Sequence, residues 1–217
     1  MGNLIRRRFD VVEAVKMLLK KALFFVSSVA VVPVVALFYC IYLFSNRDEL
    51  VAGLSQLMSL IPGLLGVYLR KAALRFFLTR CDWQSHIGFG VILSHSDTEI
   101  ADGVYIGPQS NIGKCKIARN SLLGSGVHVM SGTGQHNFND IYRPIREQGG
   151  ELKKITIGED CWIGNAALIM ANVGKGCVIA AGAVVNKDLP DFAVAVGNPA
   201  RIVRMRNISS IEGEYKP

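Results

Sequence analysis

The stretch ITIGEDCWIGNAALIMANVGKGCVIAAGAVV, residues 155–185, places an aliphatic residue at nearly every sixth position. These positions are Ile157, Ile163, Ile169, Val173, Ile179 and Val185. A helix would need apolar residues at i+3 and i+4, and a half-buried strand would alternate, so neither explains a period of six. Repetition of a hexapeptide is typical of a parallel β-helix, in which each repeat forms a short strand and a corner.

The same period extends toward the N-terminus as far as residue 87. The earlier aliphatic positions are Ile87, Leu93, Ile100, Ile106, Ile112, Ile117, Leu123 and Val129. In twelve of the fourteen cases the next residue is Gly, Ala, Ser or Asn, which suits a tight turn. Small or β-branched residues follow four positions later, and we expect Cys161 and Cys177 among them to fill the core. Steps of seven, five and four residues (Leu93–Ile100, Ile112–Ile117, Ile169–Val173) predict irregular corners.

The net charge of +7 belongs to the N-terminal third. Residues 1–80 contain 11 Lys/Arg and 4 Asp/Glu, whereas residues 81–217 contain 13 of each. Because the basic residues flank apolar sequence, they indicate membrane topology, and no nucleic-acid partner is expected. Five cysteines without a CxxC pair argue against a disulfide framework and a zinc knuckle.

The uncharged segment 22–46 is long enough to span a bilayer, and Pro33 is expected to kink it. A second uncharged segment, 50–69, could span, re-enter or lie at the interface. Basic residues lie on the outer side of both segments, which predicts a hairpin with both flanks in the cytoplasm. Residues 69–80 mix basic and apolar side chains like an interfacial helix that tethers the following domain.

The predicted organisation therefore has three parts. Residues 1–80 form a membrane-anchoring helical region, residues 81–206 a hexapeptide-repeat domain, and residues 207–217 a polar tail. The fold class is mainly β, preceded by N-terminal membrane helices. The repeat is interrupted once, by the polar excursion 134–154, and such an interruption usually carries function.

Three elements of the repeat domain occur in a specific order: WIG at 162–164, VVNKD at 184–188 and GNPARIVR at 197–204. With these elements, residues from about 81 to 206 resemble the hexapeptide-repeat acyltransferases, in particular the galactoside, maltose and polysaccharide O-acetyltransferase branch. The resemblance implies a left-handed parallel β-helix, a homotrimer, and acetyl-CoA bound in grooves between subunits. The four-residue step at Ile169–Val173 departs from the family's usual six, so a longer acyl donor stays open.

The candidate base is His136 in the excursion. Transfer of an acetyl group from a thioester to a hydroxyl needs a base with a pKa near neutrality, which histidine provides, and needs no metal. In the family a histidine entering this loop is the base, and His136 occupies that place. His128, Asp140 and Arg143 are candidates for acceptor binding, although Asp140 could instead orient His136 and each could be an ordinary surface residue.

The resemblance also implies the cofactor contacts. Asn165 matches a residue beside the pantetheine arm of CoA, and Ala181, Asn186 and Lys187 match further contacts. Arg201 and Arg204 match cations near the CoA phosphates, a role that suits guanidinium groups.

Together these features predict a membrane-associated enzyme that moves acetyl from acetyl-CoA to a sugar hydroxyl. The acceptor is expected to be a lipid-linked or nascent surface polysaccharide, reached from the cytoplasmic face of a bacterial-type inner membrane. One alternative is N-acetylation of an amino sugar or small amine. Two others are a metal-binding β-helix of the carbonic anhydrase type, which would need His95, His128 and His136 as ligands, and an inactive trimeric scaffold.

Overall fold

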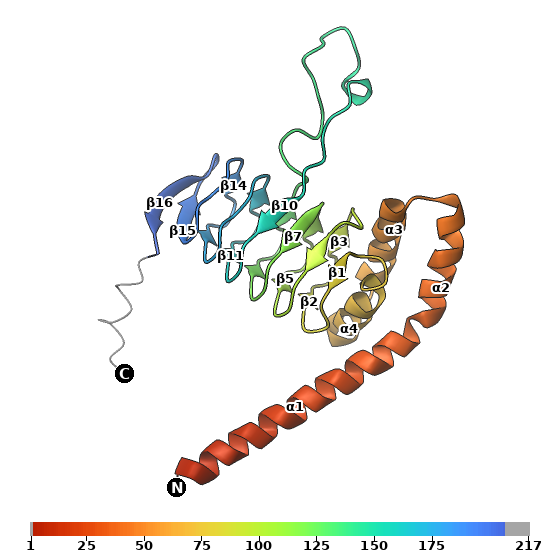
Figure 1. The fold of residues 1–217 in the computed structure, drawn as a ribbon, viewed down its shortest axis with the longest axis vertical. Helices are drawn as coiled ribbons and strands as arrows, with labels where there is room; N and C mark the ends of the chain where they lie inside the picture. The colour runs from red at the N-terminus through yellow and green to blue at the C-terminus, as the bar shows by residue number, and fades with distance from the viewer. Residues whose placement is uncertain (1, 207–217) are drawn as a thin grey trace.

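Short parallel strands build a three-sided β-helix, and in the described residues four α-helices and one short 3-10 helix precede it (Figure 1). The computed structural model describes residues 2–206. The first face consists of β1 (Arg80–Cys81), β4 (Glu99–Ile100), β7 (Cys115–Ile117) and β10 (Ile155–Ile157). The second face consists of β2 (His86–Ile87), β5 (Tyr105–Ile106), β8 (Leu122–Leu123), β11 (Trp162–Ile163), β13 (Val178–Ile179), β15 (Ala193–Val196) and β16 (Arg201–Met205). The third face consists of β3 (Ile92–Leu93), β6 (Asn111–Ile112), β9 (His128–Val129), β12 (Leu168–Ile169) and β14 (Val184–Val185).

The core of the β-helix follows the six-residue period, which confirms the predicted parallel β-helix. All fourteen aliphatic positions are buried, with at most 2% of any of them exposed. Cys115, Cys161 and Cys177 are buried as well, as expected for small residues that point inward. The left-handed sense that the resemblance implies stays a prediction.

Close stacking of the coils explains the small residue after each aliphatic one. At Gly107, an added Cβ would lie only 2.5 Å from the carbonyl carbon of Gly124 in the next coil. Gly164 meets the same constraint, because a Cβ there would lie 2.4 Å from the backbone nitrogen of Ala181. Coils about 4.8 Å apart leave no room for a side chain directed along the stacking axis.

The N-terminal helices are α1 (Gly2–Ala30), α2 (Val32–Ile41), the short 3-10 helix η1 (Tyr42–Phe44), α3 (Arg47–Ser59) and α4 (Gly63–Leu74). In Figure 1 the N-terminal part of α1 extends away from the body, whereas α3 and α4 lie against the first coil, and the remainder of α1 contacts α4. Among the residues that the structure describes, no single helix is long and apolar enough to cross a bilayer. The pair Val12–Ala30 and Val32–Phe44, bent by 44° just before Pro33, passes that test together on length and composition.

The predicted membrane hairpin is not supported by this arrangement. Its second apolar segment, 50–69, forms most of α3 and α4, and Leu50, Val51 and Leu54 are buried in the same hydrophobic core as the β-helix. The expected interfacial helix 69–80 ends at Leu74 as part of α4, and Arg70 and Lys71 are buried within the protein. The helical region and the β-helix are therefore continuous in their packing.

Polar groups of α3 and α4 form hydrogen bonds with backbone groups of the first coil that no neighbouring coil can reach. Ser55 Oγ donates to the carbonyl of Leu93 at 3.1 Å and accepts from its N–H at 3.0 Å. Arg70 Nε donates to the carbonyl of Ile87 at 2.9 Å. These bonds replace the strand that would otherwise pair with this edge, and we call α3 and α4 the cap.

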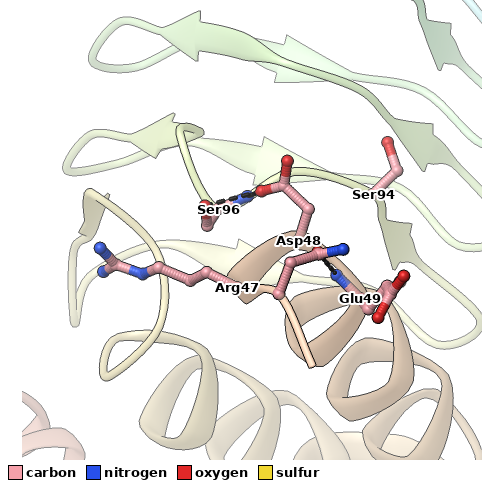
Figure 2. A pocket seen from close by; sticks show the side chains of 7 residues that line it. Arg47, Asp48, Glu49, Ser94 and Ser96 are labelled. Atoms are coloured by element: carbon pink, nitrogen blue, oxygen red, sulfur yellow. Dashed lines mark hydrogen bonds between the residues drawn. The ribbon is translucent and has the colours of Figure 1, made fainter. Parts of the chain in front are cut away.

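The start of α3 makes a further contact of this kind, shown in Figure 2. Asp48 Oδ1 accepts hydrogen bonds from the N–H and the hydroxyl of Ser96, both at 2.7 Å. Burial raises the pKa of Asp48, but these two bonds outweigh it and hold that pKa below its ordinary value. At the opposite end of the β-helix, β16 pairs antiparallel with β15 and covers the last coil.

We expect Gly107→Ala to destabilise the protein more than Gly126→Ala. Gly107 abuts the backbone of the next coil, so a methyl group must separate the coils, at a cost of about 3 kcal/mol. Gly126 has φ +64° but no atom within 4 Å of an added Cβ, so alanine there adds only backbone strain of about 1 kcal/mol. Urea unfolding of the two variants provides the test, and equal losses would contradict the stacking argument.

Candidate functional site

The irregular steps of the repeat all lie at one edge of the β-helix, where the third face meets the first. The steps Leu93–Ile100, Ile112–Ile117 and Ile169–Val173 are there, and the excursion 134–154 leaves from the same edge between β9 and β10. In Figure 1 the excursion projects away from the solenoid. Because this edge does not need a six-residue corner, it can accept an insertion while the other edges keep their stacking.

Backbone hydrogen bonds hold the two limbs of the excursion together at its base. Glu151 N–H donates to the carbonyl of Gly134 at 2.8 Å, and Asn137 N–H donates to that of Gly149 at 2.9 Å. The limbs approach closely at Gly150, where a Cβ would lie 2.0 Å from the carbonyl oxygen of Gln135.

Lys154 anchors the returning limb to earlier coils. Its Nζ donates to Asp97 Oδ1 at 2.5 Å and to Glu99 Oε1 at 2.7 Å. The bond from Lys154 lowers the pKa of Asp97, and the nearby charge of Lys114 acts in the same direction.

His136 lies on the outgoing limb, between two residues whose positions are fixed. Gln135 donates from its side chain to the carbonyl of Gly132 at 3.1 Å, and Asn137 Nδ2 donates to the carbonyl of Gln148 at 3.1 Å. The His136 side chain itself is exposed. Its backbone is thus positioned while its ring is accessible to a substrate.

His128 and the start of the excursion line the same hollow. This hollow, of about 190 Å³, lies on the third face, with Gln135 and Asn111 among its other walls. His128 Nδ1 is 3.4 Å from Asn111 Nδ2. The structure therefore places His128 and the start of the limb that carries His136 at one hollow.

Asp140 and Arg143 are exposed near the tip of the excursion, where the Gln148 side chain forms hydrogen bonds with their backbone carbonyls. Gln148 Nε2 donates to the carbonyls of Asp140 at 2.7 Å and Arg143 at 2.8 Å. The Asp140 carboxylate accepts from the N–H of Tyr142 at 2.9 Å. Within residues 12–206 the Asp140 carboxylate accepts no hydrogen bond from His136, so an orienting role for Asp140 is not seen.

Two of the expected cofactor residues, Asn165 and Ala181, are stacked in successive coils where the second face meets the third. The carbonyl of Asn165 accepts from Gly182 N–H at 2.8 Å, and its side-chain Oδ1 accepts from Ser125 N–H at 3.0 Å. Both residues are exposed along this edge. A thin amide-rich ligand arm could lie beside such small residues.

The other four cofactor candidates are exposed and lie on two further elements. Asn186 and Lys187 follow β14 at the edge that carries the excursion. Arg201 and Arg204 lie on β16, paired with Val196 and Val194 of β15. The third face is thus bordered by Asn165 and Ala181 on one edge and by Asn186, Lys187 and the excursion on the other.

A larger hollow, of about 470 Å³, lies between the start of α3 and the first coil (Figure 2). Its walls include Asp48 and Ser96, whose groups already bind one another, so the residues there serve the cap. In the part of the chain whose side chains are described, no three His, Cys, Asp or Glu residues gather as metal ligands, and His95, His128 and His136 form no such cluster.

Sequence reasoning missed Gln148, Gly150 and the Asp97–Glu99–Lys154 cluster. The Gly149-Gly150 pair in a polar loop was a usable signal, since paired glycines often mark a close backbone approach. The Asp97–Glu99–Lys154 cluster had no such signal, because Lys154 is 57 residues from Asp97 and 55 residues from Glu99 in the sequence.

Together these features describe a hexapeptide-repeat β-helix that is interrupted once by an excursion carrying a histidine. No family model matches the chain. It is 36% identical over 93 residues to a galactoside O-acetyltransferase of Lactococcus lactis, covering 40% of this chain and 45% of that protein. It is 30% identical over 123 residues to serine acetyltransferase 2 of Arabidopsis thaliana, covering 56% of this chain and 31% of that one.

Among solved structures, a maltose O-acetyltransferase from Clostridium difficile 630 shares the fold. Its TM-score is 0.55 at 23% identity, over 75% of this chain and 87% of that one. The chain spans less than half the length of the two curated relatives. By their names both curated relatives are acetyltransferases, and the solved structure shows that the chain shares the β-helix fold.

We expect Gly150→Ala to loosen the base of the excursion, because its methyl group would displace the carbonyl of Gln135. Amide exchange at Asn137 and Glu151 should then accelerate by about tenfold or more, as those bonds open. Gly134→Ala is the matched control, since a Cβ there meets no atom within 4 Å. Unchanged exchange in Gly150→Ala would show that the limbs are not held by this contact.

Proposed function

We propose that the protein transfers an acetyl group from acetyl-CoA to a sugar hydroxyl, with His136 as the general base. The observation that carries this proposal is the shared position of the His136 limb and His128 at the third face, between two edges with the expected CoA residues. Both curated relatives, by their names, acetylate acceptors that carry hydroxyl groups, a galactoside and serine.

In the proposed reaction His136 accepts the proton of the acceptor hydroxyl while its oxygen forms a bond to the thioester carbonyl carbon. The carbon–sulfur bond then breaks, and the protonated imidazole returns the proton to the departing thiolate of CoA. His136 is suited to both steps because an imidazole near neutral pKa exchanges protons at physiological pH. A backbone N–H would stabilise the oxyanion.

Asn165 and Ala181 would lie along the pantetheine arm, and Lys187, Arg201 and Arg204 would meet the phosphates. All five are exposed, which fits a ligand laid along the edges of the solenoid. Assembly as a homotrimer would add a neighbouring subunit to this groove and would cover apolar side chains that protrude from the excursion: Phe138, Ile141 and Tyr142 are 69%, 83% and 92% exposed.

Membrane association is supported by α1, η1 and the basic sequence before residue 22. Leu18, Phe25 and Phe44 are 68%, 69% and 90% exposed, and apolar surface of this extent is unusual for a protein that contacts only water. We propose that α1 and α2 insert in the inner membrane and hold the catalytic domain at its cytoplasmic face, where acetyl-CoA is available. The acceptor would then be a lipid-linked or nascent surface polysaccharide.

The test compares wild type with His136→Ala in detergent, with acetyl-CoA labelled in the acetyl group. Glycolipid extracts, soluble oligosaccharides and amino sugars serve as acceptors. We expect label in the glycolipid fraction, and a loss of about 10²-fold or more in His136→Ala with CoA affinity retained. His95→Ala is the control, because His95 lies two coils away and has no proposed role.

Equal transfer by wild type and His136→Ala would contradict the base assignment. Label in amino sugars alone, as an alkali-stable amide, would favour N-transfer. Absence of CoA binding by either protein would contradict the acetyltransferase itself.

A further inference from the structure

A second pocket, of about 390 Å³, lies on the side of the β-helix away from the third face. Its floor is the edge where the first face meets the second, over three stacked coils that contribute Ser85, Gly103 and Asn120. Helices α1 and α4 form its walls. Because this edge of a three-sided solenoid is opposite the third face, this corner pocket is separate from the candidate acetyl-transfer site.

The buried cation in the lining of the corner pocket is the ammonium of Lys71. Only 6% of the surface of Lys71 is exposed. Its Nζ donates to the carbonyl of Ser85 at 3.4 Å and lies 4.1 Å from the centre of the Tyr68 ring. An ammonium has three donors, and among the described residues no carboxylate lies within 4.0 Å of this one. Its charge is therefore buried without an anion.

Other cations surround Lys71. Lys20 lines the same pocket from α1, and Lys21 Nζ lies 5.9 Å from the centre of the Trp83 ring. Burial, reinforced by repulsion from Lys20, lowers the pKa of Lys71 to about 8, although Cys81 and Asp82 act in the opposite direction. Burial and the charges of Lys71 and Arg70 lower the pKa of His86 as well.

The acidic groups near the corner pocket offset this charge only in part, because among the described residues none forms an ion pair with Lys71. Asp102 lines the pocket, but its carboxylate is 3.7 Å from Arg80. Asp82 uses its side chain to accept the N–H of Gln84 at 2.8 Å. A buried, unpaired cation is costly unless an anion joins it, so the pocket is electrostatically complementary to a negatively charged ligand.

We propose that the corner pocket binds a phosphate-bearing group, with Lys71 and Lys20 as its cationic contacts. Phosphate offers several acceptor oxygens to the free donors of Lys71, and such charge-assisted bonds are strong. The apolar wall formed by Met17, Leu64 and Val67 would accommodate the organic part of the ligand. That ligand has two possible sources, a soluble phosphorylated metabolite or the headgroup of an anionic phospholipid.

The first arm of the test uses the full chain in detergent with inorganic phosphate and glycerol phosphate, at ionic strength held constant with chloride. We expect both anions to raise the melting temperature of wild type, and Lys71→Met to weaken their binding by about tenfold or more. Lys175→Met is the matched control: it removes an exposed lysine from the same edge of the solenoid, in a later coil outside the pocket.

The second arm measures flotation with phosphatidylcholine vesicles and with vesicles that also contain phosphatidylglycerol. If the source is lipid, wild type and Lys175→Met will prefer the anionic vesicles by about tenfold more than Lys71→Met does. An effect with soluble anions alone indicates a metabolite. If Lys71→Met changes neither arm relative to Lys175→Met, the proposal is wrong.

Should Lys71→Met fail to fold, Lys20→Gln carries the same test, because Lys20 is exposed on α1 and its loss leaves the core intact. A weaker response of Lys20→Gln in either arm supports the site, and a response equal to that of Lys175→Met overturns it. Neither arm depends on acetyl transfer.

Discussion

Hydrogen bonding between successive coils is the interaction on which the rest of this structure depends. Each coil donates to and accepts from the next along three faces, at a spacing that admits only small residues at the tight corners. The same regularity leaves an open edge at each end, which would invite pairing with another chain. The cap closes the first coil through Ser55 and Arg70, and β16 closes the last. Stability therefore comes from repetition, and the ends need dedicated partners.

The excursion with the candidate base leaves the solenoid where the repetition is irregular. Only the edge between the third and first faces takes steps of seven, five and four residues, and only there does the chain leave the solenoid. The excursion is not loose, because Lys154 fixes its returning limb to Asp97 and Glu99. A rigid solenoid thus presents one anchored loop, which carries His136 and whose start lines the same hollow as His128. The edge between the first and second faces, under α1 and α4, forms a separate basic pocket.

The repeat domain was predictable because its period is visible in a short stretch of sequence. Ile157, Ile163 and Ile169 are six residues apart, and this spacing alone indicates that they are buried. His136 stood out for the same reason, as a histidine where the period stops. The cap was not predictable, since residues 50–69 have the same apolar composition whether they face lipid or the end of a solenoid. Arg70 looked like a membrane flank, yet it donates to Ile87, 17 residues away, inside the core. The contact between Lys154 and Asp97 depends on the number of residues in each coil. That number could not be counted from the sequence, because the steps at the irregular edge vary in length.

Affinity labelling with bromoacetyl-CoA, followed by peptide mass mapping, tests the central claim most directly, because the reagent places an alkylating group where the acetyl group would lie. The account predicts a single adduct on His136 that excess CoA suppresses. An adduct that excess CoA does not suppress is unspecific labelling. A CoA-protected adduct on a residue away from the third face and the excursion, or no protected adduct, would contradict the assignment of this site.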